Sequence, residues 1–505
     1  MPFLLGLDLG TSSLKVVLFD ENGSVVGRGA AAYPLHTPRP GHAEQDPEDW
    51  WRAAGEAARQ SLSGVEGPVQ VAALGLSGQM HGTVLLDEHN RPLAPAVIWP
   101  DQRSASQVAE ITRLVGAERL IELAGSPVAT GFMAATARWF QQEQPEVWRR
   151  VRRLLLPKDS LRWRLTGEFA GDPSDGSGAL LLDVRARDWS DEILGALGIE
   201  RELLPAIQPS AALAGELCSD AAQHLGLPAG LPVVTGAADT AAGLLGGGAT
   251  GPGELLLTLS TGGQLALPSF EVEVDRQGRV HTFCSALEPE PDRAGWYRLG
   301  ATLSAGGSLR WLRDNVFALE GEGAYESMTA WAEQAPPGAN GLVFLPYLAG
   351  ERTPLMDPQA RGIFLGLALG HGRAELVRAV LEGVALSCYE AYRVLVEGGG
   401  RPERLILAGG GSRSRLWGQI VADVFALPVV RLETAEQSAV GAALLAGAGA
   451  GHFSAGQEAR AWARYGPPLE PDLTRHSLYL ELGEVFRRAY LAHREDFPRL
   501  ASLPV

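Results

Sequence analysis

The feature that most constrains the fold of this chain is a strand–loop–strand pattern that occurs once near the start of each half. The first copy, LDLGTSSLKVV, begins at Leu7, and the second, LTLSTGGQLAL, begins at Leu257, an offset of 250 residues. In each copy a loop of Gly, Ser and Thr separates two apolar runs, which predicts two strands joined by a tight turn. We interpret the pattern as a duplicated domain with a ligand cleft between the copies. Two unrelated hairpins are the alternative.

The other hydrophobic patterns predict helices and strands in alternation, and therefore an α/β fold. Residues 48–62 are expected to form a helix with Trp50, Ala54 and Ala57 on one face. The apolar segment 439–451 is rich in Ala and Gly, which favours a closely packed helix. We expect one domain over residues 1–244 and a second over 245–505. Further strands are expected at residues 3–9, 15–19, 24–27, 71–76, 231–234, 254–259, 264–267 and 404–407, and further helices at 103–123, 134–143, 187–198 and 413–425.

Composition excludes several classes of protein. The 505 residues, 46% of them hydrophobic, are enough to bury sizeable cores. The net charge of −16 argues against nucleic acid or an anionic membrane as a partner. The three cysteines are far apart and indicate neither a disulfide framework nor a metal site. Because the chain shows no signal peptide and no run of about 18 apolar residues, we expect a soluble, cytoplasmic protein.

The first candidate site is Asp8 together with the loop of Gly10, Thr11, Ser12 and Ser13. Such a loop presents backbone N–H groups and hydroxyls, which are donors suited to phosphate oxygens. A carboxylate just before the loop can hold Mg²⁺, usually through water. The alternative interpretation is a plain Gly/Ser turn beside a capped Asp.

The second candidate is Asp239, which lies among small residues in GAADTAAG (236–243). Phosphoryl transfer to an alcohol needs a carboxylate that accepts the hydroxyl proton, and small neighbours let a substrate approach closely. The alternative is that Asp239 caps the N-terminus of a helix.

The third candidate is the glycine turn of Gly409, Gly410 and Gly411 between a predicted strand and a predicted helix. Without side chains the turn can accept a planar group such as adenine, and the helix N-terminus favours phosphate. A steric need for glycine at a sharp turn is the alternative. The Walker A pattern and the protein-kinase HRD motif are absent from the sequence, so any nucleotide chemistry belongs to another class.

Polar side chains that follow two predicted strands form a candidate sugar site, because ligands of open α/β sheets bind at strand ends. A structural hydrogen bond for His81 and a core position for Trp99 are the alternatives. The candidates are Gln79, Met80 and His81 after the first strand, and Trp99, Asp101, Gln102 and Arg103 after the second.

The order of these segments resembles one family over about residues 5–451. The chain resembles the FGGY carbohydrate kinases of the actin/Hsp70/hexokinase-like superfamily, and its SGQMHG segment resembles the substrate segment of the xylulokinases among them. The segments that carry the resemblance are LGLDLGTSSLK (5–15), SGQMHG (77–82), LLPKDSLRWRLTGEFAGDPSDGSG (155–178), GAADTAAG (236–243), STGG (260–263), TLSAGGSLRWL (302–312), FLPYLAGERTPLMDPQARGIFLGL (344–367) and AGGGSRSRLWGQIVAD (408–423).

The resemblance implies two RNase H-like (actin-like ATPase) domains around a catalytic cleft, and ATP-dependent phosphorylation of D-xylulose to D-xylulose 5-phosphate with Mg²⁺. It implies that Asp239 is the general base and that Asp8 organises Mg²⁺. The implied sugar-binding residues are Gln79, Met80, His81, Asp101, Arg103, Asp239 and Thr240. The implied ATP- or phosphate-binding residues are Gly10, Thr11, Ser12, Ser13, Lys15, Thr261, Gly262, Gly306, Gly409 and Gly410.

Three positions depart from the family pattern. Thr240 stands beside the expected base where Asn is typical, Pro100 stands where Asn is common, and Thr136 replaces a signature Lys. Because a hydroxyl replaces an amide beside the base, a kinase for another ketose or polyol (ribulose, gluconate, glycerol or erythritol) stays open as an alternative. A non-catalytic sugar- or nucleotide-binding regulator of the same fold is a further alternative, and a homodimer is an open expectation.

Lysine usage singles out two further positions. Only Lys15 and Lys158 are lysines among the 43 basic residues, and both lie inside the segments that carry the resemblance. A compact ammonium suits one phosphate oxygen or a tight contact better than a planar guanidinium does. We therefore expect Lys→Arg to be damaging at either position, through packing or polar contacts.

Overall fold

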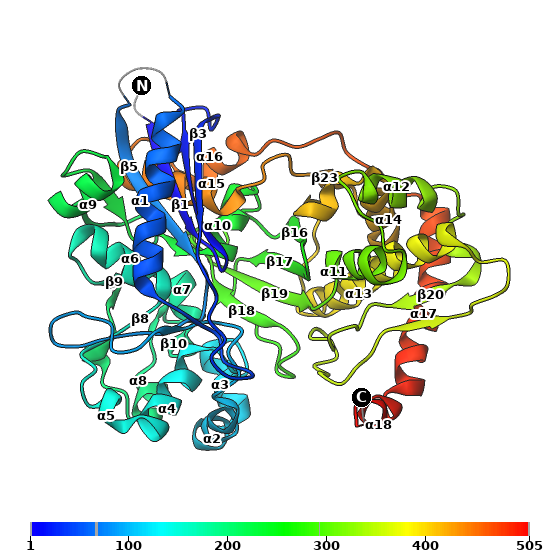
Figure 1. Ribbon diagram of the computed structural model, residues 1–505, viewed down its shortest axis with the longest axis horizontal. Coiled ribbons are helices and arrows are strands. Elements are labelled where there is room, and N and C mark those ends of the chain that lie inside the picture. The colour runs from blue at the N-terminus through cyan, green and yellow to red at the C-terminus, as the bar shows by residue number, and fades with distance from the viewer. Residues whose placement is uncertain (1–2, 66–68, 292, 503–505) are drawn as a thin grey trace. The chain divides into compact units, whose positions relative to one another are not determined.

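The computed structural model describes residues 3–65, 69–291 and 293–502, which form two compact units (Figure 1). Unit 1 comprises Met1–Gly251, Pro268–Tyr297 and Glu436–Ala463, and unit 2 comprises Pro252–Leu267, Arg298–Ala435 and Arg464–Val505. The expected boundary after residue 244 therefore differs from the observed division, because two later segments return to unit 1.

Unit 1 is built on a seven-stranded sheet with the order β13-β14-β5-β1-β2-β3, in which β15 also pairs with β5. Strand β1 is antiparallel to β2 and parallel to β5. Helix α1 (Pro47–Ser63) runs alongside the sheet (Figure 1) and buries Trp50, Ala54 and Ala57, as expected. The strands are β1 (Phe3–Leu9), β2 (Ser13–Phe19), β3 (Val25–Ala32), β5 (Val71–Gly78), β13 (Leu213–Glu216), β14 (Pro232–Val234) and β15 (Ala237–Ala238).

Alternation along β1 divides the faces of this sheet. Leu5, Leu7 and Leu9 belong to the same buried cluster as Trp50 of α1, so they face that helix. Gly6 faces the opposite way, where a Cβ on it would lie 2.0 Å from the carbonyl oxygen of Ala439 in α15 (Gln437–Gly449). Helices therefore cover both faces of the sheet.

Helix α15 lies against the sheet and against α10 (Asp239–Gly246) at backbone distance. A Cβ on Gly75 would lie 1.9 Å from the carbonyl oxygen of Ala442, and a Cβ on Gly441 would lie 1.9 Å from that of Ala242. The expectation of a closely packed Ala/Gly helix is confirmed. Its contact with β1 and β5 explains why residues 436–463 belong to unit 1.

Unit 2 repeats the strand arrangement of unit 1. Strand β16 (Glu254–Leu259) is antiparallel to β17 (Gly263–Ser269) and parallel to β22 (Arg404–Ala408), and β23 (Val429–Arg431) extends the sheet beyond β22. Strand β19 (Trp296–Thr302) flanks β17. Because β1, β2 and β5 pair in the same way, the expectation that the two halves open with equivalent strand–loop–strand units is confirmed. The α/β fold class is confirmed as well.

Several predicted helices are shorter than expected. Gly116, with φ 93°, separates α2 (Ala105–Val115) from α3 (Ala117–Ala124), where one helix was expected. Residues 187–198 begin with strand β11 (Asp188–Trp189), and Ser190 then caps α8 (Asp191–Leu197). The expected helix 413–425 begins at Arg415, as α14 (Arg415–Phe425), after a short 3₁₀ turn, η4 (Gly410–Arg413).

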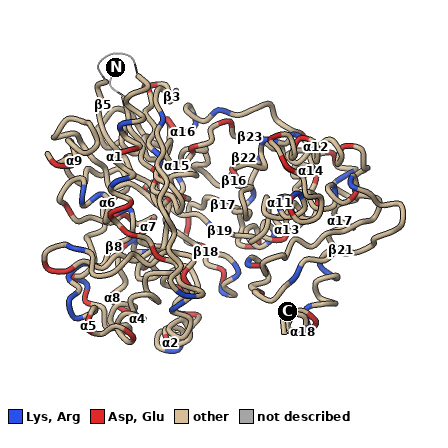
Figure 2. Tube along the Cα trace, viewed as in Figure 1, with Lys and Arg blue, Asp and Glu red and all other residues tan. Residues whose placement is uncertain are grey.

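The remaining elements complete the two units. None of the helices within the described ranges is long and apolar enough to cross a membrane. Acidic and basic residues are scattered over the helices and loops of both units (Figure 2). The other helices are α4 (Met133–Glu143), α5 (Pro145–Trp148), α6 (Pro157–Thr166), α7 (Pro173–Ser177), α9 (Ser219–Leu225), α11 (Gly306–Trp311), α12 (Ala324–Ala332), α13 (Arg373–Glu397), α16 (Ala455–Trp462), α17 (Leu473–His493) and α18 (Asp496–Ala501). The other strands are β4 (Glu44–Gln45), β6 (Val84–Leu86), β7 (Ala96–Val97), β8 (Arg153–Leu155), β9 (Ala170–Gly171), β10 (Leu182–Asp183), β12 (Ala206–Ile207), β18 (His281–Cys284), β20 (Val343–Leu345) and β21 (Ile363–Leu365).

The backbone contact between the sheet and α15 predicts a large effect of one methyl group. We expect Gly75→Ala to lower the free energy of unfolding by about 1–3 kcal/mol, because the added Cβ overlaps the Ala442 carbonyl. Gly195→Ala is the matched control. It lies in α8 with no atom within 4 Å of the added Cβ, and it should be neutral or stabilising by up to about 1 kcal/mol. Urea unfolding measures both, and equal stability of the two variants would contradict the packing.

Candidate active site

Asp239 is the first residue of α10 and directly follows β15. The pairing of Ala237 with Ser77 and of Ala238 with Gly78 places Asp239 beside the end of β5. The residue at the N-cap is Ala238, so the alternative in which Asp239 caps the helix is wrong. Its Oδ1 instead accepts hydrogen bonds from the backbone N–H and the hydroxyl of Thr240, at 2.6 and 3.2 Å.

Asp8 lies on the other side of Ser77, since β1 pairs with β5 at this residue. The Ser77 hydroxyl donates to Asp8 Oδ1 at 2.9 Å. Lys15 is the cross-strand partner of Asp8 on β2, so the two side chains share a face of the sheet. Three neighbouring strands thus bring the two predicted catalytic carboxylates to one region of unit 1.

The two carboxylates influence each other electrostatically. Burial, and then the charge of Asp8, raise the pKa of Asp239 to about 7, against the opposing effect of the hydrogen bonds from Thr240. Burial also raises the pKa of Asp8, although the Ser77 hydrogen bond and the charge of Lys15 partly offset it. A carboxylate with a pKa near neutral can accept a proton from an alcohol far more readily than an ordinary Asp can.

The loop after Asp8 is held in place by residues from outside β1. The Tyr33 hydroxyl donates to the carbonyl of Gly10, Trp99 Nε1 donates to Thr11 Oγ1 at 2.9 Å, and Gln45 Nε2 donates to the Thr11 carbonyl at 2.6 Å. Trp99 contacts this loop and is partly exposed to solvent. The alternative that places Trp99 in the core is therefore wrong. Ser12 is exposed at the tip of the loop.

The 79–81 segment continues from the end of β5. Gln79 Nε2 donates to Gln45 Oε1 at 2.8 Å, and Met80 is buried. His81 has a positive φ of 75°, and its Nδ1 lies 2.7 Å from the carbonyl oxygen of Gly178. Its ring centre lies 3.7 Å from that of Phe132. This carbonyl contact is the structural hydrogen bond that was the alternative for His81, and it orients the imidazole ring.

Asp101 and Arg103 form a buried ion pair with each other. Arg103 Nη2 lies 2.8 Å from Asp101 Oδ2 and 2.7 Å from Glu44 Oε1. The backbone N–H of Ala43 donates to Asp101 Oδ2 at 2.6 Å. These contacts join β4 to the segment after β7. The charges of Asp101 and Arg103 are both paired within the protein, so a contact of either residue with a sugar stays a prediction.

Unit 2 contains a pocket of about 560 Å³ at the loops that follow β16 and β22. Thr261, Gly306 and Gly410 line it, and Gly262 and Gly409 are their chain neighbours. Gly409 has φ 80°, and a Cβ on Gly306 would lie 2.4 Å from the carbonyl oxygen of Ser260, so both positions require glycine. The alternative interpretation, a steric need for glycine at a sharp turn, therefore holds for Gly409. It does not hold for Gly410, where an added Cβ would meet no atom within 4 Å.

The sequence did not single out the partners that hold these residues. Tyr33 and Gln45 carry no local motif, and Phe132 lies in the signature-like stretch GFMAATARW (131–139) but was not selected as a site residue. Three buried acids around Lys158, namely Asp159, Asp172 and Asp175, were within a segment that carried the family resemblance but were not selected as site residues. The sequence feature that could have indicated this group is that three acids lie in the same segment as Lys158, one of only two lysines in the chain.

A buried carboxyl group with a raised pKa at a strand end and a glycine-lined pocket are features that a phosphotransferase acting on an alcohol would use. The chain belongs to the FGGY family of carbohydrate kinases, whose N-terminal domain matches residues 3–246 and whose C-terminal domain matches residues 270–450. It is therefore a carbohydrate kinase.

Similar proteins match over nearly the whole chain. The xylulose kinase of Escherichia coli K12 is 39% identical over 96% of this chain and 98% of its own length, and that of Bacillus subtilis is 34% identical over 98% of both. The gluconokinase of Bacillus subtilis is 32% identical over 88% of this chain and 86% of its own length. The crystal structure of xylulose kinase from Rhodospirillum rubrum has a TM-score of 0.90 at 31% identity, covering 98% of this chain and 99% of that one.

The raised pKa of Asp239 predicts opposite effects of one substitution on activity and on stability. We expect Asp239→Asn to abolish turnover and to raise the free energy of unfolding at about pH 8. Because the folded-state pKa of about 7 exceeds the ordinary 3.8, the folded state binds more protons between these values, and wild-type stability falls as the pH rises through them. The Asn side chain carries no ionisable group, so the variant does not lose stability in this way as the pH rises.

Urea unfolding at about pH 5 and about pH 8, with a kinase assay, tests this prediction. The gain in stability should be larger at the higher pH. Asp220→Asn, which removes an exposed carboxylate in α9, is the control and should leave activity unchanged. Surviving turnover in Asp239→Asn would contradict the role of Asp239 as the base.

Proposed function

We propose that this carbohydrate kinase transfers the γ-phosphate of ATP to D-xylulose and forms D-xylulose 5-phosphate. The observation that carries the proposal is the position of Asp239 beside the 79–81 segment. β15 ends one residue before Asp239 and pairs with the last residues of β5, from which Gln79, Met80 and His81 continue. The near full-length similarity to xylulose kinases supports D-xylulose as the sugar.

Asp239 performs the proton transfer in this proposal. Its carboxylate accepts the proton of the terminal hydroxyl of the sugar, the oxygen attacks the γ-phosphorus in line, and ADP leaves. With a pKa of about 7, half of the Asp239 side chains are ionised near neutral pH and able to accept the proton. Met80 supplies an apolar surface, and His81, held by the Gly178 carbonyl, supplies a polar edge to the sugar.

The residues around Asp8 fit a magnesium ion. Asp8 offers carboxylate oxygens, and the adjacent loop offers hydroxyls of Thr11, Ser12 and Ser13, which are the hard oxygen donors that Mg²⁺ prefers. Mutual repulsion between Asp8 and Asp239 is a further reason for a cation here. When bound, Mg²⁺ neutralises charge on the transferred phosphate. Lys15, across the strand pair from Asp8, adds positive charge on the same face.

We assign the nucleotide to the pocket of unit 2. Thr261, Gly306 and Gly410 line it together with the aromatic side chains of Tyr325 and Trp417, so that it offers both bare backbone and apolar surface to a planar base. Arg310, whose Nη2 lies 3.4 Å from Thr261 Oγ1, adds a positive charge suited to phosphate. The cleft between the two domains, the cytoplasmic location and the homodimer stay predictions.

Thr240 favours a second candidate function, a kinase for another ketose or polyol. Its hydroxyl donates to Asp239 Oδ1, so it occupies one oxygen of the base and presents no amide to the substrate. The similarity to a gluconokinase supports gluconate among the alternatives. A non-catalytic regulator of the same fold would consume no ATP with any of these sugars.

A substrate panel tests the proposed sugar. We expect kcat/KM for D-xylulose to exceed that for L-ribulose, gluconate, glycerol and erythritol by at least about tenfold, because unpaired polar groups in a sugar site disfavour the wrong hydroxyl pattern. A coupled assay of ADP formation measures this with the purified protein. Equal or faster turnover of another polyol would overturn D-xylulose, and the absence of turnover with every sugar would favour the regulator.

The assignment of ATP predicts a selective effect at Gly410. A side chain there meets no protein atom close to its Cβ but enters the pocket, so we expect Gly410→Val to raise KM for ATP by about tenfold, which corresponds to about 1.4 kcal/mol. KM for the sugar and the melting temperature should stay unchanged. Gly370→Val, at an exposed turn with equal space, is the control. An unchanged KM for ATP in Gly410→Val would place the nucleotide elsewhere.

A further inference from the structure

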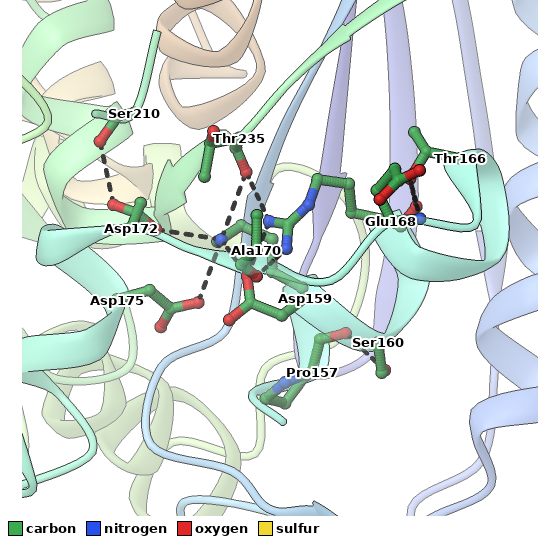
Figure 3. A network of polar contacts seen from close by, with 12 residues as sticks. Pro157, Asp159, Ser160, Thr166, Glu168, Ala170, Asp172, Asp175, Ser210 and Thr235 are labelled. Atoms are coloured by element: carbon green, nitrogen blue, oxygen red, sulfur yellow. Dashed lines mark hydrogen bonds and ion pairs between the residues drawn. The ribbon is translucent and has the colours of Figure 1, made fainter. Parts of the chain in front are cut away.

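Lys158 lies in a buried group of charges in unit 1, where it contacts Asp159, Asp172 and Asp175, the acids that are labelled in Figure 3. Its Nζ lies 2.6 Å from Asp159 Oδ1, 3.0 Å from Asp172 Oδ1 and 3.7 Å from Asp175 Oδ2, and all four side chains are at most 1% exposed. Arg162 adds a second cation, with Nη1 2.8 Å from Asp159 Oδ1. We call these five residues the Lys158 cluster.

The ammonium of Lys158 takes the place that a metal ion would occupy. Oxygens of the three carboxylates lie within 4.8 Å of one another, which is the spacing of a cation site, and Nζ supplies the positive charge at that spacing. Burial alone would lower the pKa of Lys158, but the charges of Asp159, Asp172 and Asp175 outweigh burial and raise it. The ammonium therefore keeps its proton at neutral pH.

The Lys158 cluster is bonded to the segment that carries Asp239. The carbonyl oxygen of Thr235 accepts hydrogen bonds from Lys158 Nζ at 3.4 Å and from Arg162 Nη1 at 2.8 Å. Thr235 lies four residues before Asp239 in the chain, and Gly236, which lies between them, has φ 82°. A shift of the Thr235 carbonyl therefore moves the turn that leads into the base.

A second link runs through helix α7, whose N-cap is Asp172. The backbone N–H of Ala238 donates to Ser174 Oγ at 3.0 Å, and the Ser174 hydroxyl donates in turn to Asp172 Oδ2. Asp172 is the residue that Lys158 contacts from the other side. Immediately after α7, the carbonyl of Gly178 accepts the hydrogen bond of His81. One short helix therefore joins the cluster to both the base and the sugar segment.

We propose that Lys158 is a positioning residue for the phosphoryl transfer: it fixes the Asp239 segment through the Thr235 carbonyl and through the Asp172–Ser174–Ala238 chain of hydrogen bonds. The inference rests on the proposed function of Asp239 as the base. A lysine fits because its stem passes Gly78, where an added Cβ would lie 2.9 Å from Lys158 Cβ, and because a compact ammonium can face three carboxylates at once.

Two serines of α7 provide a matched test of the hydrogen-bond chain. Ser174→Ala removes the link to Ala238. Ser177→Ala removes an equally buried hydroxyl whose partners are the Ser174 carbonyl and the Cys284 N–H, away from Asp239. We expect Ser174→Ala to lower kcat by about tenfold or more, since small misplacements of a reacting group are costly. KM for the sugar should change by less than about twofold, and Ser177→Ala should keep the wild-type kcat.

The charge of Lys158 is tested by a pair of substitutions, because Lys158→Met alone leaves three buried carboxylates with one cation and is expected to be strongly destabilised. Adding Asp175→Asn restores the formal net charge of the cluster, counted with every carboxyl group ionised, because one cation and one acid are removed together. We expect the double variant to recover most of the unfolding free energy but to keep a kcat about tenfold or more below that of Asp175→Asn alone.

The outcomes separate the inference from the proposed function. Equal kcat in Ser174→Ala and Ser177→Ala overturns the hydrogen-bond chain, and a double variant as active as Asp175→Asn overturns the role of Lys158. If the double variant does not fold, the serine pair decides. Absence of sugar phosphorylation by the wild-type protein, with any sugar of the panel, would be a failure of the proposed function instead.

Discussion

The constraint on which the proposed site depends is the burial of the Asp239 carboxyl group, to which the charge of the nearby Asp8 adds. The parallel pairing of β1 and β15 with β5 places Asp8 beside Ser77 and Asp239 just beyond the paired residues Ala238 and Gly78, in a region where burial disfavours the charged forms of both acids. At pH values above the ordinary pKa of Asp, this unfavourable burial of charge lowers the stability of the folded state. In the function proposed here, the raised pKa lets Asp239 take a proton from an alcohol near neutral pH.

The surrounding structure offsets this cost by holding the two strands rigidly. Helix α15 contacts β1 and β5 at backbone distance through Gly6 and Gly75, so neither strand can move away from the other without opening the core. The Lys158 cluster fixes the approach to Asp239 from the opposite end of the segment. The favourable free energy of packing and of the buried ion pairs thus offsets the unfavourable free energy of placing Asp8 and Asp239 close together.

The parts of the site that local patterns could predict are those that lie in one loop. Asp8 with its Gly/Ser loop, Asp239 among small residues, and the glycine turn after β22 were all found from runs of neighbouring residues. The Lys158 cluster could not be found in this way, because Asp172 and Thr235 meet Lys158 only through the tertiary fold. The ion pair of Arg103 with Glu44 and the return of residues 436–463 to unit 1 were missed for the same reason.

The pH dependence of kcat/KM for D-xylulose, at saturating ATP and Mg²⁺, tests the central claim most directly. If Asp239 is the base and burial raises its pKa, the rate should fall as the pH drops, with a midpoint well above the ordinary 3.8 of an exposed Asp even when Mg²⁺ offsets the charge of Asp8, and with a slope of about tenfold per pH unit below it. A profile that stays flat down to about pH 5, or a midpoint near the ordinary 3.8 of an exposed Asp, would contradict the account.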